Sequence, residues 1–297
     1  MNAPLKDYLD YHRNNALMWE IDTHLDAAVY FADKYNLSLE SRCWLAFLTS
    51  LCETTPTSLY LFKHFPSFDS ATPEAFESFC SRNRGAMAFQ YDVRWILYEI
   101  GKVLASYKQL IGGPSQYPRL LSFAQGRDKY QRFSEFCRRF RCYRFGNYTF
   151  MLYTELLHYL CGLDIEAVLN PEDNHSVRSG LIYACGYEGI INCVRKGTKP
   201  TRQEADLLRI ELQEIIAAVR GLDILPRHKT TWAIETTLCT YNKTKHGRRY
   251  LGFYKARQAR EIARLTTYTA QIGEPFDWSD LLEYHNLWGK WHNRYAS

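Results

Sequence analysis

The cysteines of this sequence have none of the spacings that hold a structural zinc ion. Nine cysteines are scattered singly, no C-x-x-C pair occurs, and Cys137 and Cys142 are the closest two. The nine histidines are also well spread, whereas zinc ligands recur at short, regular intervals. We therefore expect free thiols, a reducing compartment and no metal held by the side chains of this chain.

Targeting signals and long apolar runs are also missing. The sequence does not open with a basic stretch followed by an apolar core, and no apolar run is long enough to cross a bilayer. These absences predict a soluble, cytoplasmic protein without a membrane partner.

Three common catalytic motifs do not occur either. The sequence has no G-x-G-x-x-G fingerprint, no Walker loop and no G-x-S-x-G elbow, which argues against dinucleotide-binding enzymes, P-loop nucleotidases and α/β-hydrolases. It also has no internal repeat, low-complexity tract or obvious linker. We therefore predict one domain over residues 1–297.

Aromatic residues are present in surplus. The 297 residues include 22 Tyr, 16 Phe and 7 Trp, and aromatics make up 15% of the chain. Hydrophobic content of 46% and charged content of 23% are ordinary for a folded protein. Tyrosine can stack on a nucleic-acid base as well as fill a core, so the surplus admits either use.

Capping signals and apolar periodicity predict helices along the whole chain. Thr201 and Glu204 form a T-x-x-E capping box, and the apolar face that follows ends at Gly221. The other expected helix starts are Ser38, Thr57 after Pro56, Thr72 with Pro73, a position near Val93, and Asp277 ahead of Trp278, Trp288 and Trp291.

Two further stretches are less regular. Residues 17–35 form an amphipathic segment, and PEDNHSVRSGLIYACGYEG is compatible with a brief strand or a buried helical turn. Neither stretch changes the predicted fold class, which is all-α.

The stretch RRFRCYRFGNYTFMLYTELLHYLCGLDIE predicts a buried helix of about four turns. Asn147 is its expected N-cap and Gly162 its expected C-terminal glycine. Glu155 and His158 share one face of this apolar helix. They are either a structural pair that ties the helix to a neighbouring Arg, or a catalytic or substrate-orienting site. Glu235 and Asp92 also occupy apolar surroundings.

Two tracts combine basic and aromatic residues. The first leads into the central helix with seven Arg or Lys between Arg127 and Arg144 against two acids, and the second covers residues 243–260. Such tracts form either a solvated helix face or a phosphate-binding surface. In the first tract, the interleaved Tyr130, Phe133, Phe136 and Tyr143 favour the phosphate-binding surface.

Five segments carry a family resemblance, namely RCWLAFLTSLCETTPTSLYLFKHFP, AFQYDVRW, RFGNYTFMLYTELL, SVRSGLIYACG and IETTLCTYNK. In this order they resemble the alpha-glutamyl/putrescinyl thymine pyrophosphorylases of bacteriophages, also described as amino acid:DNA transferases. The resemblance runs from about Leu39 to Arg260. The chain departs from the family pattern at Asn147 after Gly146 and at the looser segment Val177–Gly180.

The resemblance implies an enzyme that acts on 5-hydroxymethyluracil in DNA after its hydroxymethyl group has been pyrophosphorylated. The enzyme would replace the pyrophosphate with an amine. The implied fold is a single helical domain like that of helical DNA glycosylases, and the target base would be flipped out of the duplex. The implied partners are modified DNA and a small amine or amino acid, in an infected bacterial cell. No cofactor is expected, although Mg²⁺ could accompany the pyrophosphate, and the oligomeric state stays open.

Residue roles follow from this reaction. The candidate catalytic groups are Glu155 or Glu235 as the base that deprotonates the amine, Cys239 as a thiol that adds to the pyrimidine, and Asp92 without a more specific role. The candidates for binding pyrophosphate and the amine are Arg178, Ser176, His175, Lys243, Arg248 and Arg249. The candidates for binding DNA are Tyr91, Arg94, Arg138, Arg139, Arg141, Arg144, Tyr148 and Lys245.

Two other functions stay open at this stage. The chain could be a DNA glycosylase or hydrolase acting on a modified thymine, or a DNA-binding protein without catalysis. Among amines, the sequence favours a small amino acid over putrescine, because Arg178 could hold a carboxylate.

Overall fold

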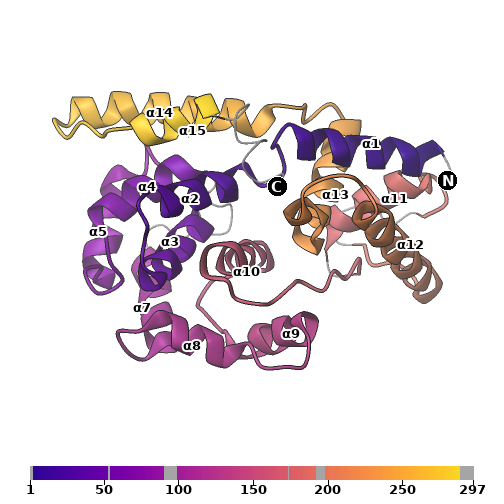
Figure 1. The fold of residues 1–297 in the computed structure, drawn as a ribbon, viewed down its shortest axis with the longest axis horizontal. Helices are drawn as coiled ribbons and strands as arrows, with labels where there is room; N and C mark the ends of the chain where they lie inside the picture. The colour runs from indigo at the N-terminus through magenta and orange to yellow at the C-terminus, as the bar shows by residue number, and fades with distance from the viewer. Residues whose placement is uncertain (1–2, 53, 90–98, 173, 192–197, 288–297) are drawn as a thin grey trace. The chain divides into compact units, whose positions relative to one another are not determined.

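The computed structural model describes residues 3–52, 54–89, 99–172, 174–191 and 198–287. Over these ranges the regular structure consists of helices, with an isolated bridge between Cys52 and Phe89 and no sheet. The predicted all-α fold class is therefore confirmed (Figure 1).

The chain divides into two compact units, each built from segments far apart in the sequence. Unit 1 contains the described residues of 3–23 and 168–254, and unit 2 contains those of 24–167 and 255–287. The single domain expected over residues 1–297 stays a prediction.

Unit 1 is built around four α-helices and a 3-10 helix in its described part. They are α1 (Ala3–Leu17), α11 (His175–Cys185), α12 (Arg202–Arg220), η2 (Pro226–Lys229) and α13 (Thr231–Lys245). Polar side chains cap the starts of α11, α12 and α13, at Asn174, Thr201 and Thr230. The capping box predicted for Thr201 and Glu204 is present and confirmed.

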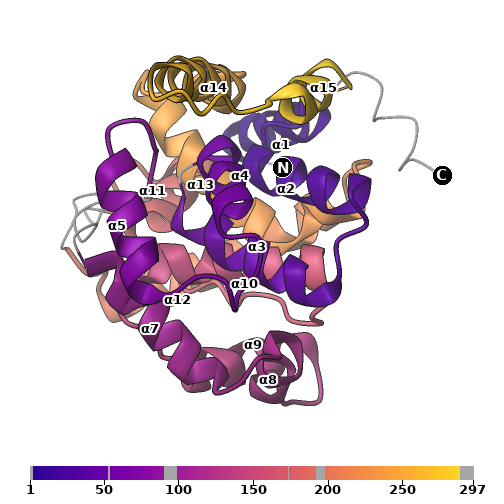
Figure 2. The ribbon, with the colours of Figure 1, turned by 90° about the vertical axis from the view of Figure 1, so that its left-hand side faces the viewer.

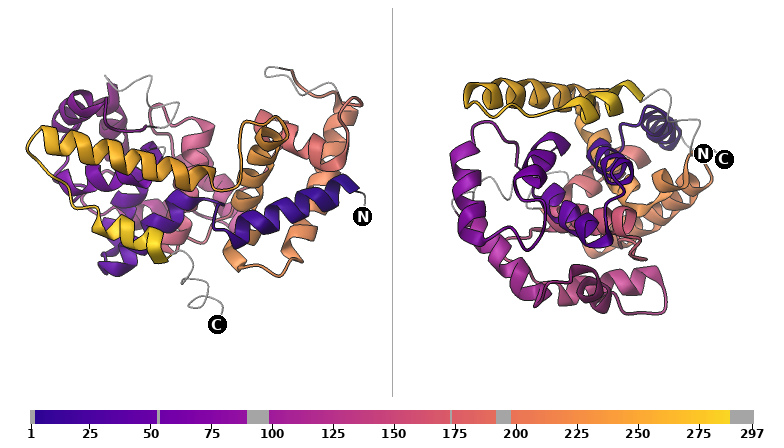
Figure 3. Two further views of the ribbon diagram at one scale, coloured as in Figure 1. Left: turned by 90° about the horizontal axis from the view of Figure 1, so that it is seen from above. Right: turned by 60° about the vertical axis from the view of Figure 1, so that its left-hand side comes forward.

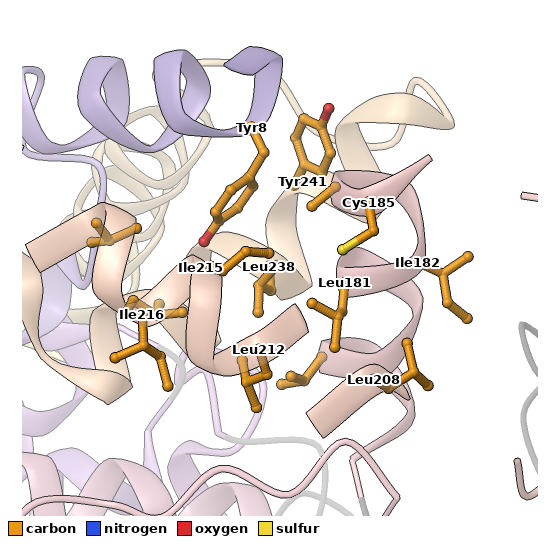
Figure 4. Close-up of a cluster of buried hydrophobic side chains, with 14 of the residues drawn as sticks. Tyr8, Leu181, Ile182, Cys185, Leu208, Leu212, Ile215, Ile216, Leu238 and Tyr241 are labelled. Carbon is orange, nitrogen blue, oxygen red and sulfur yellow. The ribbon is translucent and has the colours of Figure 1, made fainter. Parts of the chain in front are cut away.

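The core of unit 1 lies among α1, α11, α12 and α13. Figure 4 shows Leu208, Leu212, Ile215 and Ile216 beside Leu181 and Leu238. Their spacing along α12 follows the helical period, which turns one apolar stripe inward. Tyr8 of α1 meets Tyr241 of α13 edge to face, with ring centroids 5.4 Å apart.

Gly180 is the point of closest approach between α11 and α13. A Cβ atom at this position would lie 2.0 Å from the carbonyl oxygen of Leu238 and 2.5 Å from its carbonyl carbon. Real side chains cannot tolerate such distances, so glycine is required for the two helix backbones to touch.

Unit 2 contains the remaining helices. They are α2 (Thr23–Lys34), α3 (Leu39–Leu51), α4 (Thr55–His64), α5 (Pro73–Asn83), α7 (Ile100–Ile111), α8 (Gln116–Phe123), α9 (Lys129–Arg139), α10 (Asn147–Cys161), α14 (Phe253–Gln271) and α15 (Ser279–Leu287). Helices α3 and α10 pack against each other at its centre (Figures 1 and 2). The predicted caps at Ser38, Thr72 and Asp277 are confirmed by side-chain bonds to the following N–H groups.

Much of the aromatic surplus fills the core of unit 2. Phe47 of α3 stacks on Tyr107 of α7, with ring centroids 4.1 Å apart. The Tyr107 hydroxyl lies 2.9 Å from the hydroxyl of Tyr153 on α10 and donates to Gln116 over 2.9 Å. Because each buried phenol has a polar partner, these tyrosines serve packing, and they are not available to stack on a base.

Several helix boundaries differ from the sequence prediction. The amphipathic segment expected over residues 17–35 becomes helical only at Thr23, because Trp19 and Asp22 adopt left-handed φ angles of 55° and 52° between α1 and α2. Helix α4 starts at Thr55 and not at Thr57, since Pro56 fits the first turn, where its missing N–H is not needed. The strand alternative for PEDNHSVRSGLIYACGYEG is wrong, because this stretch forms α11.

The central helix α10 has the predicted length but a different start. Gly146 occupies the N-cap position without a side-chain bond, so the prediction of Asn147 as the cap is wrong, and Asn147 is the first helical residue. Gly162 has a φ of 68° and ends the helix as predicted. The predicted start near Val93 and the tryptophans Trp288 and Trp291 lie outside the described residues.

Candidate active site

One face of α13 carries three of the predicted catalytic and binding residues. Glu235, Cys239 and Lys243 follow one another at four-residue intervals, so they lie along the same side of the helix. The Nζ atom of Lys243 lies 3.2 Å from the Sγ atom of Cys239. Glu235 is buried, whereas Cys239 and Lys243 are half-buried. A carboxyl, a thiol and an ammonium group thus form a row, which we call the α13 row.

Asn174 connects the α13 row to the start of α11. Its Nδ2 atom donates to Oε1 of Glu235 over 3.0 Å. Its Oδ1 atom accepts from the N–H groups of Ser176 and Val177, over 3.0 and 3.2 Å. The Ser176 side chain in turn acts to lower the pKa of Cys239. One amide group therefore caps α11 and holds the carboxyl of Glu235 beside the helix N-terminus.

Burial controls the electrostatics of the α13 row. It raises the pKa of Glu235, while the hydrogen bond from Asn174 and the charge of Lys243 act in the opposite direction. Burial also raises the pKa of Cys239, and the neighbouring Glu235 raises it further. Glu235 is thus a stronger base than an exposed glutamate, and the thiol is a poorer source of thiolate than an exposed cysteine.

Arg249 and Tyr254 lie close to the same row. The guanidinium carbon of Arg249 is 3.7 Å from the ring centroid of Phe253 and 5.7 Å from that of Tyr254. Burial raises the pKa of the Tyr254 phenol, the charge of Cys239 raises it further, and the charge of Arg249 lowers it. The buried Nε atom of Arg249 has no hydrogen-bond partner among the described residues. The row therefore combines a base with two cations and a helix N-terminus.

A model of the family described as amino acid:DNA transferase matches residues 20–250 of the chain. The chain belongs to the amino acid:DNA transferase family. The α13 row, Asn174 and Arg249 all lie inside the matched region. Searches of curated proteins and of solved structures found no match.

The family match confirms the resemblance drawn from five sequence segments. It supports a transferase that acts on DNA with an amino acid. The likeness to helical DNA glycosylases stays a prediction. Among the described residues, no helix is long and apolar enough to cross a membrane.

Arg178 of this transferase is buried inside unit 1. Its Nη1 atom donates to the carbonyl oxygens of Pro171 (3.1 Å) and Glu172 (2.9 Å), and its Nη2 atom donates to that of Thr198 (2.7 Å). These bonds fasten to α11 the segment that precedes it, at Pro171 and Glu172, and the segment that follows it, at Thr198. Arg178 thus has a structural role, and its predicted contact with substrate stays a prediction.

Replacing Arg178 by Lys should lower the free energy of unfolding by about 1–2 kcal/mol. An ammonium group keeps the charge, but it cannot reach three carbonyls through a planar fork. Urea unfolding followed by circular dichroism measures the loss. We expect relative use of amino acids and simple alkylamines to stay unchanged. A selective loss of amino acid transfer at unchanged stability would instead place Arg178 at the substrate.

The other predicted binding residues of unit 1 differ in their surroundings. His175 is half-buried and is the first residue of α11, whereas Arg248 is exposed. Lys245 forms an ion pair with Asp7 at 2.5 Å, and this hydrogen bond is the largest cause of the lowered pKa of Asp7. Lys245 is therefore engaged within the protein, and its predicted contact with DNA stays a prediction.

Glu155 and His158 lie on α10 in unit 2. Glu155 is buried. The Nδ1 atom of His158 lies 3.0 Å from the carbonyl oxygen of Leu163, and burial lowers the pKa of His158. His158 thus helps to close the C-terminus of α10. The catalytic role of Glu155 stays a prediction, and the candidates Asp92, Tyr91 and Arg94 lie outside the described residues.

The basic tract of unit 2 is only partly open to solvent. Arg138 and Arg139 both pair with Glu135, with shortest distances of 2.8 and 3.2 Å. Phe133 and Phe136, which were expected to alternate with the charges on the surface, are buried. That interpretation is wrong, because α9 is amphipathic and turns its phenylalanines inward. Arg138 and Arg139 are nevertheless exposed, as are the predicted DNA contacts Arg141, Arg144 and Tyr148, of which Arg144 has a left-handed φ of 58°.

Neutralising Arg141 and Arg144 together should reduce the salt dependence of DNA binding. Each phosphate contact contributes about −0.9 to the log–log slope of affinity against salt on duplex DNA. In the variant with both Arg141→Gln and Arg144→Gln, the slope should therefore be less steep by about 1.8. Fluorescence anisotropy of labelled DNA at several salt concentrations measures it. Arg13→Gln, an exposed residue of α1, is the control. An unchanged slope would assign these arginines to a solvated face.

Asn174 and Tyr254 were not recognised from the sequence. Asn174 precedes HSV in a pattern that is typical of a helix cap, but no local signal connects it to a carboxyl 61 positions later. Among the described residues, no group of three His, Cys, Asp or Glu side chains is arranged to hold a metal. The expected absence of a metal stays a prediction.

Proposed function

We propose that this chain joins an amino acid to the base of a 5-pyrophosphorylated hydroxymethyl-deoxyuridine in DNA and releases pyrophosphate. The observation that carries this proposal is the α13 row, in which Asn174 holds the buried Glu235 in line with Cys239 and Lys243. The base would be flipped out of the duplex to reach the row. The reaction would take place in the cytoplasm of an infected bacterial cell.

Direct displacement accounts for every atom of the reaction. The amine nitrogen forms a bond to the exocyclic methylene carbon, and the carbon–oxygen bond to pyrophosphate breaks, with its electron pair leaving on oxygen. An ammonium group must first lose a proton, and Glu235 accepts it. Burial raises the pKa of Glu235, so this pKa lies closer to that of the amine than the pKa of an exposed glutamate does.

Cations near the row support departure of the pyrophosphate. Lys243 and Arg249 supply positive charge, and the N-terminus of α11 adds the positive end of its helix dipole. Pyrophosphate could also bring Mg²⁺ bound to its own oxygens. Adding a chelator to the assay tests that requirement.

A thiol route through Cys239 is the second mechanism. Addition of the thiolate at C6 of the pyrimidine would expel pyrophosphate and leave an exocyclic methylene, to which the amine then adds before the thiolate departs. The raised pKa of Cys239 disfavours the thiolate, so direct displacement is the preferred route. Cys239→Ala should retain transfer by direct displacement and abolish transfer by the thiol route.

Mass spectrometry of nucleosides separates the competing functions. DNA containing pyrophosphorylated hydroxymethyluracil is incubated with the protein and a pool of amino acids and polyamines, then digested. An amine adduct supports the transferase. Released base supports a glycosylase, free hydroxymethyluracil supports a hydrolase, and unchanged substrate that stays bound supports a binding protein.

Competition among amines should favour amino acids over putrescine. The carboxylate of an amino acid is attracted to the cations near the row, whereas the second ammonium of putrescine is repelled by them. Glycine, serine, glutamate and putrescine are offered at equal concentrations and the adducts counted by mass. A majority of putrescine adducts would contradict this charge argument.

A further inference from the structure

Helix α14 of unit 2 carries a second charged cluster, separate in sequence from the α13 row. Arg257, Arg260 and Arg264 line a pocket of about 270 Å³ together with Glu261 and Ala88. Figure 3 shows α14 as one long continuous helix, and the three-residue and four-residue spacings bring the arginines onto one face. A single water molecule needs only about 15 Å³ measured in the same way. The pocket can therefore hold a polyatomic ion.

Glu261 is buried beside this pocket, and α4 fixes its position. Its Oε1 atom accepts from the hydroxyl of Thr57 and, over 3.2 Å, from the N–H group of Thr57. The Thr57 hydroxyl accepts from the N–H group of Ala88 over 2.8 Å. The other carboxyl oxygen, Oε2, is equally buried and has no hydrogen-bond partner in the described part of the chain. Buried polar atoms are usually hydrogen-bonded, so Oε2 can take a hydrogen-bonding ligand in the adjoining pocket.

The charge of the pocket indicates what that ligand is. Burial raises the pKa of Glu261 to about 7, although Thr57, Arg264 and Arg257 act to lower it. Near neutral pH a large fraction of Glu261 is therefore protonated and can donate through Oε2. The guanidinium groups of Arg260 and Arg264, both exposed, bring positive charge to the pocket. Forked N–H donors beside an O–H donor match the tetrahedral oxygens of a phosphate group.

We propose that the pocket formed by Arg257, Arg260, Glu261 and Arg264 binds a phosphate group, carried either by the DNA backbone or by free pyrophosphate. Arg260 and Arg264 hold the phosphate oxygens, and Oε2 of Glu261 donates to one of them. These four residues lie beyond the region matched by the family model, which ends at residue 250. The proposal does not depend on the chemistry at the α13 row, because it concerns equilibrium binding.

Sulfate is the first probe, because it does not titrate between pH 6 and pH 8. An anion prefers the protonated form of Glu261, and a group with a pKa of about 7 is roughly tenfold more protonated at pH 6 than at pH 8. Calorimetric titration should therefore show about tenfold tighter sulfate binding at pH 6. Glu261→Gln should bind sulfate with no such dependence, because an amide donates at both values. Equal or tighter sulfate binding by the wild type at pH 8 would overturn the proposal.

Arginine variants test the pocket itself. Arg260→Gln and Arg264→Gln change exposed side chains, and each should weaken sulfate binding by about tenfold through loss of charge-assisted hydrogen bonds. Arg202→Gln, an exposed change of equal charge on α12, is the control and should bind normally. Circular dichroism verifies that every variant is folded.

The same variants identify the source of the phosphate. Weaker binding of duplex DNA with unchanged pyrophosphate binding assigns the pocket to the DNA backbone, and the reverse result assigns it to free pyrophosphate. Unchanged binding of sulfate, pyrophosphate and DNA in both variants would overturn the proposal. A failure of the proposed transferase function would appear separately, as absent adducts with these binding constants intact.

Discussion

Replacing Glu235 by Gln is expected to lower the single-turnover rate of amine transfer by about 10²–10⁴-fold. Gln keeps the shape of the side chain and can still accept from Asn174, but it cannot take a proton from the attacking amine. The free energy of unfolding should change little, because a buried carboxyl is replaced by a neutral group of equal size. Single-turnover rate and thermal melting on one preparation measure both effects.

The pH profile provides a second readout of Glu235. Burial raises its pKa above the ordinary value of 4.5, so the carboxyl is still protonated where an exposed glutamate is already ionised. A base must be ionised, so the wild-type rate should rise with pH through this raised pKa. Because its pKa is higher in the folded than in the unfolded chain, Glu235 binds its proton more tightly when the protein is folded. Its contribution to the free energy of unfolding is therefore full at low pH and is lost as pH rises through the raised pKa. Glu235→Gln should remove both dependences.

Glu155→Gln is the matched control for this prediction. It makes the same chemical change at the other described candidate base, also buried but on α10 of unit 2. If Glu155→Gln lowers the rate and Glu235→Gln does not, the base is Glu155. Normal rates in both variants would show that neither Glu155 nor Glu235 is the base.

Replacing Gly180 by Ala is expected to lower the free energy of unfolding by about 3 kcal/mol, at the upper end of what overpacking usually costs. The new methyl group would lie 2.0 Å from the carbonyl oxygen of Leu238, and a backbone atom cannot move aside alone. Helices α11 and α13 would have to separate. Since the bond from Asn174 to Glu235 spans these helices, transfer activity should fall as well.

Gly113→Ala is the control for the glycine substitution. A Cβ atom at Gly113 would meet nothing within 4 Å, and its φ lies outside the left-handed region. Alanine there should be neutral or stabilising by about 0.4–1 kcal/mol, because it restricts the unfolded chain. Urea unfolding of both variants gives the comparison. Equal midpoints for Gly180→Ala and wild type would contradict the close approach of α11 and α13.

Local sequence signals predicted the helices well wherever a cap or a periodic apolar face was present. The capping box at Thr201 and Glu204 and the glycine after α10 depend on residues within one turn of each other, so the sequence contains the whole interaction. The start of α2 was expected too early, because left-handed φ angles at Trp19 and Asp22 have no residue signature comparable to glycine.

The use of the aromatic residues could not be predicted from their number. Phe133 and Phe136 alternate with arginines in the sequence, which is typical of a base-stacking surface and equally of an amphipathic helix. Burial decides between these alternatives, and burial depends on which helices cover α9. In the structure both side chains belong to the core, while Tyr148 is 49% exposed.

The sequence by itself determined the all-α class, the family, and the row of Glu235, Cys239 and Lys243 on one helix face, because four-residue spacing acts within a single helix. Only the tertiary structure decided that Asn174 holds Glu235, that Arg178 is bonded to loop carbonyls, and that Glu261 lies buried among three arginines. These contacts join residues from different elements. Their geometry arises from the packing of whole helices, and no local sequence pattern contains that information.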